Sequence, residues 1–210
     1  MIELELKYQI EAPCVELENF PVVKSLFQED MYYDTKDYHL IRNGNFLRVR
    51  NNERIDFKLN TNDLTHLYCK ETSFKTVEVE RKNDEINAVL KSIGLSCDQK
   101  YKSFKDFVNE NGLVILSPIR KNRKTYQIDE KMKISVDEAE NIGTFLEAEI
   151  MVDADNITPH EANKIKENMI KILKEKSLLS PEDKAVNIGY VELYLEQHNR
   201  QAYDLGLYKR

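Results

Sequence analysis

Charged and apolar residues alternate in several short segments of the chain, and this pattern constrains the fold more than any other feature. Residues 2–7 read Ile-Glu-Leu-Glu-Leu-Lys, so three apolar side chains alternate with Glu3, Glu5 and Lys7. Because successive side chains of a β-strand point to opposite faces, this segment predicts a strand with one apolar and one charged face. Taken alone, it is typical of an antiparallel strand whose polar face is solvated.

The same alternation recurs further along the chain. Residues 46–50, 54–59, 74–81, 132–137 and 145–151 each place apolar residues on one face of a predicted strand and charged or polar residues on the other. So many amphipathic strands predict a large antiparallel sheet. Its charged faces either form a solvated surface or line a polar tunnel, if the sheet closes into a barrel with helices packed outside.

The remaining segments mix helices with further strands. Pro13 and Pro159 suit the first turn of a helix, Ser103 suits a helix N-cap, and Gly94 suits a helix end. The chain has no low-complexity tract, repeat or Gly/Ser/Pro-rich linker, so we expect a single α+β domain over residues 1–210. The expected helices span about 13–27, 84–93, 103–109 and 158–175, with a last one after Pro181, and the expected strands span 31–35, 113–121 and 124–128.

Composition excludes several classes of partner. The net charge of −6 and the isoelectric point near 5.4 do not favour nucleic-acid or membrane-surface binding. Cys14, Cys69 and Cys97 are odd in number and lack CxxC spacing, so neither a disulfide framework nor a zinc site is indicated. With no apolar leader and no apolar stretch of transmembrane length, we expect a cytoplasmic protein, either a monomer or a homodimer.

The charged faces of the predicted strands are balanced in sign. They carry seven acids and seven bases, so an enclosed lumen would be close to neutral, which makes its burial tolerable. The acids are Glu3, Glu5, Glu78, Glu80, Asp137, Glu147 and Glu149, and the bases are Lys7, Arg48, Arg50, Lys58, Lys121, Arg123 and Lys133.

The acidic and the basic residues suit different kinds of ligand. Oxygen-rich clusters such as Glu3, Glu5 and the 147–149 segment suit hard divalent cations such as Mg²⁺ or Mn²⁺. Guanidinium forks and ammonium groups suit a polyphosphate chain. Two divalent cations and a triphosphate carry nearly opposite charges, so their joint entry would preserve the balance.

The motifs together resemble the CYTH superfamily, also called triphosphate tunnel metalloenzymes. They cover roughly residues 1–196 and follow the family's order. The motifs are Glu3-x-Glu5-x-Lys7, Tyr32-Tyr33-Asp34-Thr35, Leu47-Arg48-Val49-Arg50, Lys58, Lys121-x-Arg123, Asp137 and Gly143-x-Phe145-x-Glu147-x-Glu149.

The resemblance implies an eight-stranded antiparallel β-barrel that forms a tunnel, with helices outside, and metal-dependent chemistry on a triphosphate with two divalent cations. It implies catalytic roles for Glu3, Glu5 and Lys7, and a tunnel acid at Glu78 or Glu80. The implied metal ligands are Glu3, Glu5, Asp137, Glu147 and Glu149, and the implied triphosphate-binding residues are Lys7, Arg48, Arg50, Lys58, Lys121, Arg123 and Lys184. Lys184 is displaced from the family's pattern, so whether it reaches the tunnel stays open.

Three functions are compatible with these residues. The first is metal-dependent hydrolysis of inorganic tripolyphosphate, thiamine triphosphate or a nucleoside triphosphate. The second is a class IV type of adenylyl cyclase, in which the 3′-hydroxyl of ATP attacks the α-phosphorus. The third is a polyphosphate- or nucleotide-binding module without turnover. Hydrolysis is the expected activity, because no sequence feature identifies an adenosine pocket.

Overall fold

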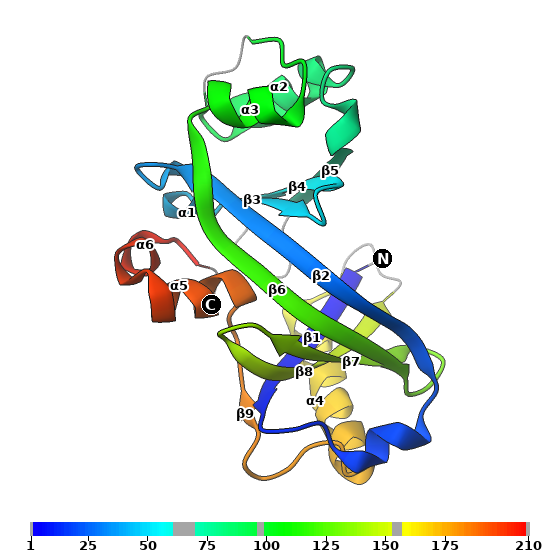
Figure 1. Cartoon of the computed structure of the whole chain (residues 1–210). Helices are drawn as coiled ribbons and strands as arrows, with labels where there is room; N and C mark the ends of the chain where they lie inside the picture. Colours follow the sequence, from blue (N-terminus) through cyan, green and yellow to red (C-terminus); the bar gives the residue numbers. More distant parts are fainter. Residues whose placement is uncertain (1, 61–69, 96–98, 153–156, 209–210) are drawn as a thin grey trace. The chain divides into compact units, whose positions relative to one another are not determined.

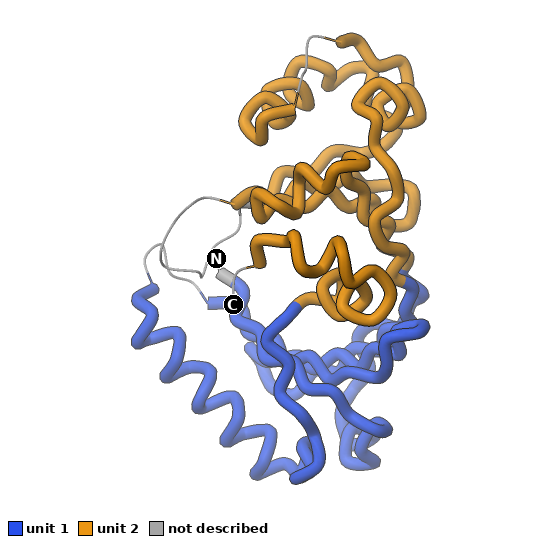
Figure 2. The backbone as a smooth tube through the Cα atoms, turned by 90° about the vertical axis from the view of Figure 1, so that its left-hand side faces the viewer, with its two compact units in different colours: residues 1–28, 120–188 blue, residues 29–119, 189–210 orange. Residues whose placement is uncertain are grey.

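We describe the protein from a computed structural model, which describes residues 2–60, 70–95, 99–152 and 157–208. The chain forms two compact units, coloured separately in Figure 2: unit 1 consists of residues 1–28 and 120–188, and unit 2 of residues 29–119 and 189–210. The long strands β2 (Val22–Thr35) and β6 (Leu113–Gln127) run through both units.

The described strands form one large sheet (Figure 1). It has nine strands in the order β5-β4-β3-β2-β6-β7-β8-β1-β9, and the pairs with a described register are antiparallel. The order ends at β5 and β9, and no described pair joins these two edges, so the closed eight-stranded barrel is not confirmed. The other strands are β1 (Ile2–Ile10), β3 (Phe46–Arg50), β4 (Arg54–Leu59), β5 (Lys70–Lys75), β7 (Met132–Ala139), β8 (Gly143–Val152) and β9 (Lys184–Ala185).

Several helices accompany the sheet, which confirms the mixed class with a large antiparallel sheet. Ser103 caps one helix as predicted, because its side chain accepts a hydrogen bond from the backbone N–H of Asp106. The helices are α1 (His39–Arg42), α2 (Asn83–Ser92), α3 (Phe104–Glu110), α4 (Pro159–Glu175), α5 (Tyr190–His198) and α6 (Arg200–Leu205), with short 3₁₀ helices η1 (Val15–Asn19) and η2 (Thr76–Glu78).

In unit 1 the apolar faces of β1, β7 and β8 form the core together with α4. Helix α4 begins with a capping box in which Thr158 and Glu161 bond each other's backbone N–H groups. Its Met169 and Leu173 are fully buried against strand residues such as Ile134. Because α4 covers the apolar face, the charged residues at the alternate positions of these strands share the other face.

In unit 2 the apolar faces of β3, β4 and β5 pack against α2 and α3. Val49, Ile55 and Phe57 lie in a buried cluster with Leu90 of α2 and Phe107 of α3. Phe57 and Phe107 meet edge to face, with ring centroids 6.3 Å apart. As in unit 1, this packing leaves the charged residues of the strands together on the opposite face.

The predicted helix over residues 13–27 is wrong. The chain there forms only the 3₁₀ helix η1 and then enters β2 at Val22. The β-branched pair Val22-Val23 favours an extended backbone, and the apolar stripe is not a buried helix face, because Val23 and Phe27 are about half exposed.

The predicted strand over residues 74–81 is also wrong beyond its first two residues. Strand β5 begins earlier, at Lys70, and ends at Lys75, where η2 begins. The alternation after Phe74 therefore does not describe a strand face, and Val77 is 82% exposed. Conversely, the two strands predicted at 113–121 and 124–128 form one continuous strand, β6.

Candidate functional site

The polar face of unit 1 gathers charged residues from neighbouring strands. Glu5 of β1 lies directly opposite Glu149 of β8, and Lys7 lies opposite Glu147. On β7, Asp137 lies opposite Arg123 of β6. Most of the charged positions predicted on these four strands therefore share one face, as the alternation required.

Three carboxylates from β1 and β8 converge on one point of this face. Each of Glu3, Glu5 and Glu149 offers an oxygen, and these oxygens lie within 4.8 Å of one another. Burial and then the negative charge of Glu3 raise the pKa of Glu149 to about 7. Burial and the charge of Glu147 likewise raise the pKa of Glu5. A set of hard oxygen donors with a net negative charge fits a divalent cation such as Mg²⁺ or Mn²⁺.

Glu147 was predicted with these ligands, but its carboxylate is engaged by bases. It forms ion pairs with Lys7, at 3.2 Å, and with Arg123. Lys7 also reaches Glu5 at 3.2 Å. Burial works to lower the pKa of Lys7, but the charges of Glu5 and Glu147 outweigh burial and raise it. Lys7 therefore links the three-carboxylate cluster to a buried network of ion pairs.

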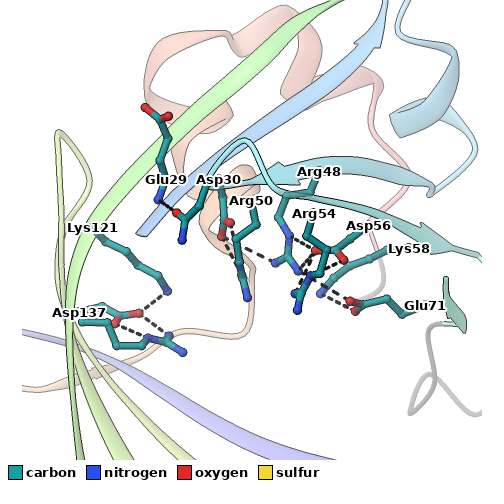
Figure 3. Close-up of polar contacts among 12 residues, drawn as sticks. Glu29, Asp30, Arg48, Arg50, Arg54, Asp56, Lys58, Glu71, Lys121 and Asp137 are labelled. Atoms are coloured by element: carbon teal, nitrogen blue, oxygen red, sulfur yellow. Dashed lines mark hydrogen bonds and ion pairs between the residues drawn. The ribbon is translucent and has the colours of Figure 1, made fainter. Parts of the chain in front are cut away.

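Asp137 is the centre of that network. It is fully buried and accepts a hydrogen bond from the Lys121 ammonium at 2.5 Å (Figure 3). It also accepts hydrogen bonds from two nitrogens of Arg123 at 2.6 and 2.5 Å. Burial works to raise the pKa of Asp137, but these cations outweigh it and hold the pKa below its usual value. The predicted role of Asp137 as a metal ligand stays a prediction; its oxygens here hold Lys121 and Arg123.

Unit 2 carries a second polar face, in which each arginine of β3 is held by a buried carboxylate (Figure 3). Arg50 donates two hydrogen bonds to Asp30 of β2, at 2.7 and 2.9 Å. Arg48 donates two to Asp56 of β4, at 3.1 and 2.7 Å. Such charge-assisted, fork-like pairs fix the orientation of a guanidinium group.

The sequence interpretation missed the other members of this face. Arg54 and Ser73 both contact Asp56, and Glu71 of β5 lies 3.8 Å from Arg48 and from Lys58. Asp56 could have been found, because it alternates with Lys58 in β4. Glu71 and Ser73 could not, because the predicted strand began only at Phe74.

Four predicted positions are not brought into these clusters. Glu78 belongs to η2 and pairs with Arg81 at 3.6 Å, and Glu80 is exposed in the turn that follows. Neither lies on a strand face, so the expectation of a tunnel acid at one of them is wrong in its structural premise. Lys133 of β7 and Lys184 of β9 are exposed. The phosphate-binding role of Lys184 stays a prediction, as does the arrangement of both polar faces around one lumen.

Comparison with known protein families shows to which family the chain belongs. The family model described as "CYTH domain" matches residues 1–181. The chain belongs to the CYTH domain family. The observed placement of the CYTH motifs in β1, β3, β6, β7 and β8 agrees with the resemblance derived from the sequence.

Similar proteins include putative cyclases and one protein described with triphosphatase activity. "Putative adenylate cyclase MJ0240" of Methanocaldococcus jannaschii is 27% identical, over 92% of this chain and 98% of that protein. The PH1819 structure from Pyrococcus horikoshii matches with 21% identity and a TM-score of 0.61, covering 93% and 99% of the two chains. "Putative adenylyl cyclase HpAC1" from Hippeastrum, described with a dominant triphosphatase activity, matches with 19% identity and a TM-score of 0.59, covering 93% and 96%. These structures establish the likeness of fold.

Among the described residues, no helix is both long enough and apolar enough to cross a membrane.

Proposed function

We propose that this protein is a metal-dependent hydrolase of triphosphate compounds. The observation that carries the proposal is the convergence of Glu3, Glu5 and Glu149 within 4.8 Å, on the sheet face that also carries Lys7 and Arg123. An acidic cluster beside fixed cations suits a substrate that arrives as a highly charged anion with divalent metal. The CYTH family membership supports the same class of chemistry.

The residues have separate tasks in this proposal. Glu3, Glu5 and Glu149 would hold Mg²⁺ or Mn²⁺, with two cations expected when the triphosphate is bound. Bound there, the metal would screen phosphate charge and make a water molecule more acidic. Lys7 and Arg123 would donate hydrogen bonds to phosphate oxygens and stabilise the charge that develops on them. Glu147 and Asp137 would keep Lys7 and Arg123 oriented through their ion pairs.

The arginines of β3 would add a second phosphate-binding surface. Arg48 and Arg50 are held by Asp56 and Asp30 while retaining further N–H groups for a ligand. The family resemblance supports the further proposal that the sheet closes as an eight-stranded barrel around the bound triphosphate.

A product assay tests the proposal. Tripolyphosphate, thiamine triphosphate and ATP are incubated with the protein in Mg²⁺, in Mn²⁺ and in EDTA, and orthophosphate, pyrophosphate and cyclic AMP are measured. We expect metal-dependent orthophosphate release from at least one substrate. We expect Glu5→Gln to abolish it, because the variant removes a charged oxygen from the cluster without changing the size of the side chain.

Glu138→Gln is the matched control. Glu138 is an exposed acid of β7, adjacent to Asp137 but on the opposite side of the strand, so its neutralisation should leave release unchanged. Phosphate release by Glu5→Gln at the wild-type rate would refute the assignment of the cluster. Tight binding of tripolyphosphate without any product in either metal would instead favour a binding module.

Cyclisation of ATP is the second candidate. It is favoured by the similarity to the Methanocaldococcus jannaschii relative, of which the match covers 98%. The same assay separates the two reactions, because a cyclase releases pyrophosphate together with cyclic AMP, whereas a hydrolase releases orthophosphate. Cyclic AMP as the main product from ATP would replace hydrolysis by cyclisation at the same site.

A further inference from the structure

Asp56 lies at the centre of the polar face of unit 2 and is fully buried. One carboxylate oxygen, Oδ2, accepts hydrogen bonds from Nε and Nη2 of Arg48 at 3.1 and 2.7 Å and from Nη2 of Arg54 at 3.1 Å. The other oxygen, Oδ1, accepts from the Ser73 hydroxyl at 2.7 Å and lies 2.8 Å from Nε of Arg54. A single carboxylate therefore fixes two guanidinium groups.

The two guanidinium groups differ in how open they are. The Arg48 side chain is 8% exposed, whereas the Arg54 side chain is 45% exposed and lies directly opposite Arg50 in the register of β3 and β4. Each guanidinium has five N–H donors, and the contacts with Asp56 use only some of them. The Nη1 group of Arg48 lies 3.8 Å from Asp30, which is too long for a hydrogen bond. Both arginines thus keep donors for an anion.

The carboxylate remains ionised in this setting. Burial works to raise the pKa of Asp56, but the hydrogen bonds from Ser73 and Arg48 and the charge of Arg48 outweigh it and lower the pKa. Asp56 is therefore an anion at neutral pH, in contact with two guanidinium groups.

We propose that Asp56 is a positioning residue that holds Arg48 and Arg54 side by side as a joint seat for one phosphate group of the substrate. The inference rests on the proposed function and adds to it Arg54, which no family motif in the sequence indicated. Planar guanidinium groups bind phosphate best when their forks are already oriented, because less side-chain freedom is then lost on binding.

A positioning role and a simple charge-balancing role predict opposite changes in anion affinity when Asp56 is neutralised. Replacing Asp56 by Asn adds one positive charge to the face, so charge alone predicts tighter binding of an anion. Loss of the oriented pair predicts weaker binding instead. Glu71 provides the matched control on the same face, because its carboxylate lies 3.8 Å from Arg48 and from Lys58 and is too distant to orient either by hydrogen bonding.

The test is direct binding of inorganic tripolyphosphate by calorimetry in EDTA, where a metal-dependent hydrolase does not turn over. We expect Asp56→Asn and Arg54→Gln each to weaken binding about tenfold. The double variant should be little weaker than either single variant, because both remove the same seat. Glu71→Gln, with the same charge change as Asp56→Asn, should bind as tightly as wild type or a few times more tightly.

A variant that keeps Asp56 intact guards against misfolding. Arg48→Lys preserves the charge but not the fork, so positioning predicts a loss of about tenfold, whereas a purely electrostatic role predicts none. Wild-type or tighter binding by Asp56→Asn, or additive losses in the double variant, would overturn the proposal. Absence of tripolyphosphate binding by the wild type would also overturn the proposed phosphate site. The proposed function is tested separately, by the assay for metal-dependent phosphate release.

Discussion

Neutralising Glu149 should stabilise the metal-free protein at alkaline pH. Glu149 lies directly opposite Glu5 in the register of β1 and β8, and Glu3 completes the cluster. Like charges directly opposite each other destabilise an antiparallel pair. Burial of the ionised carboxylate adds the larger cost, and the charge of Glu3 adds to it. We therefore expect Glu149→Gln to relieve a burial cost and a repulsion that exist only when this carboxylate is ionised.

The pKa of Glu149 sets the size and the pH range of this effect. Folding raises that pKa from 4.5 to about 7. Between these values the native state binds a proton that the unfolded state has lost, so the free energy of unfolding falls as the pH rises. A shift of about 2.5 pKa units corresponds to about 3 kcal/mol, absent below pH 4.5 and complete above pH 7.

Thermal unfolding in EDTA at pH 5 and pH 8.5 measures the effect. For a chain of 210 residues, about 3 kcal/mol corresponds to a rise in Tm of roughly 6–12 °C for Glu149→Gln at pH 8.5, with little change at pH 5. Mg²⁺ should raise the Tm of wild type more than that of the variant, because ligand binding to the native state stabilises it.

Glu147→Gln is the matched control two residues along the same strand. Glu147 pairs with Lys7 and Arg123, and its side chain is 4% exposed, so neutralising it should lower the Tm at pH 8.5. The same chemical change would then change the Tm in opposite directions at two neighbouring positions on one face of β8. A fall in the Tm of Glu149→Gln at pH 8.5, or an equal rise at both pH values, would refute the account of the cluster as mutually repelling carboxylates.

Three further predictions concern single interactions. Asp137→Asn should destabilise the protein at pH 7 by about 3 kcal/mol, because it leaves Lys121 and Arg123 without their shared anion. Folding lowers the pKa of Asp137, so the stabilisation by its carboxylate is present above the unfolded pKa and disappears as the pH falls through the folded pKa. In urea unfolding, the free energies of unfolding of wild type and variant should therefore converge in acid. A difference that stays constant with pH would contradict this. The fully buried Asp34 carboxylate accepts hydrogen bonds from the backbone N–H groups of Leu40 and Ile41 at 2.8 and 3.0 Å. Asp34→Asn should therefore speed amide hydrogen exchange at these two residues and lower the free energy of unfolding by about 1–3 kcal/mol. Unchanged exchange would count against this prediction. Thr158→Ala should lower the Tm by roughly 2–4 °C through the loss of about 1 kcal/mol of N-cap stabilisation of α4, and no shift would show that the cap is redundant.

Strands with regular alternation could be predicted from the sequence because each position specifies its own face. Phe46–Arg50 and Arg54–Leu59 were predicted with the observed bounds, and the charged positions of β1 and β8 share one face as expected. The cap at Ser103 was equally local, because a side chain three residues from a backbone N–H finds it without help from the rest of the chain.

Segments whose apolar residues fit both the helix spacing and the strand spacing could not be assigned from the sequence. Residues 22–27 carry apolar side chains that fit an imperfect helix stripe, yet they form the beginning of β2. The partner strands of a sheet, supplied from far along the sequence, stabilise the extended form, and local propensity cannot include them. The segment after Phe74 failed for the opposite reason, because alternation continued where the strand had already ended.

The sequence alone determined which residue types this protein places on its polar strand faces, and through the family motifs it determined the family. Tertiary structure decided which of those charges repel one another and which form ion pairs. Register set Glu149 opposite Glu5 to form the acidic cluster, and it set Glu147 opposite Lys7 to form an ion pair. Strand pairing also brought Asp30 to Arg50 across 20 positions of chain. Whether a carboxylate binds metal or holds a cation depends on its cross-strand neighbour, and only folding specifies that neighbour.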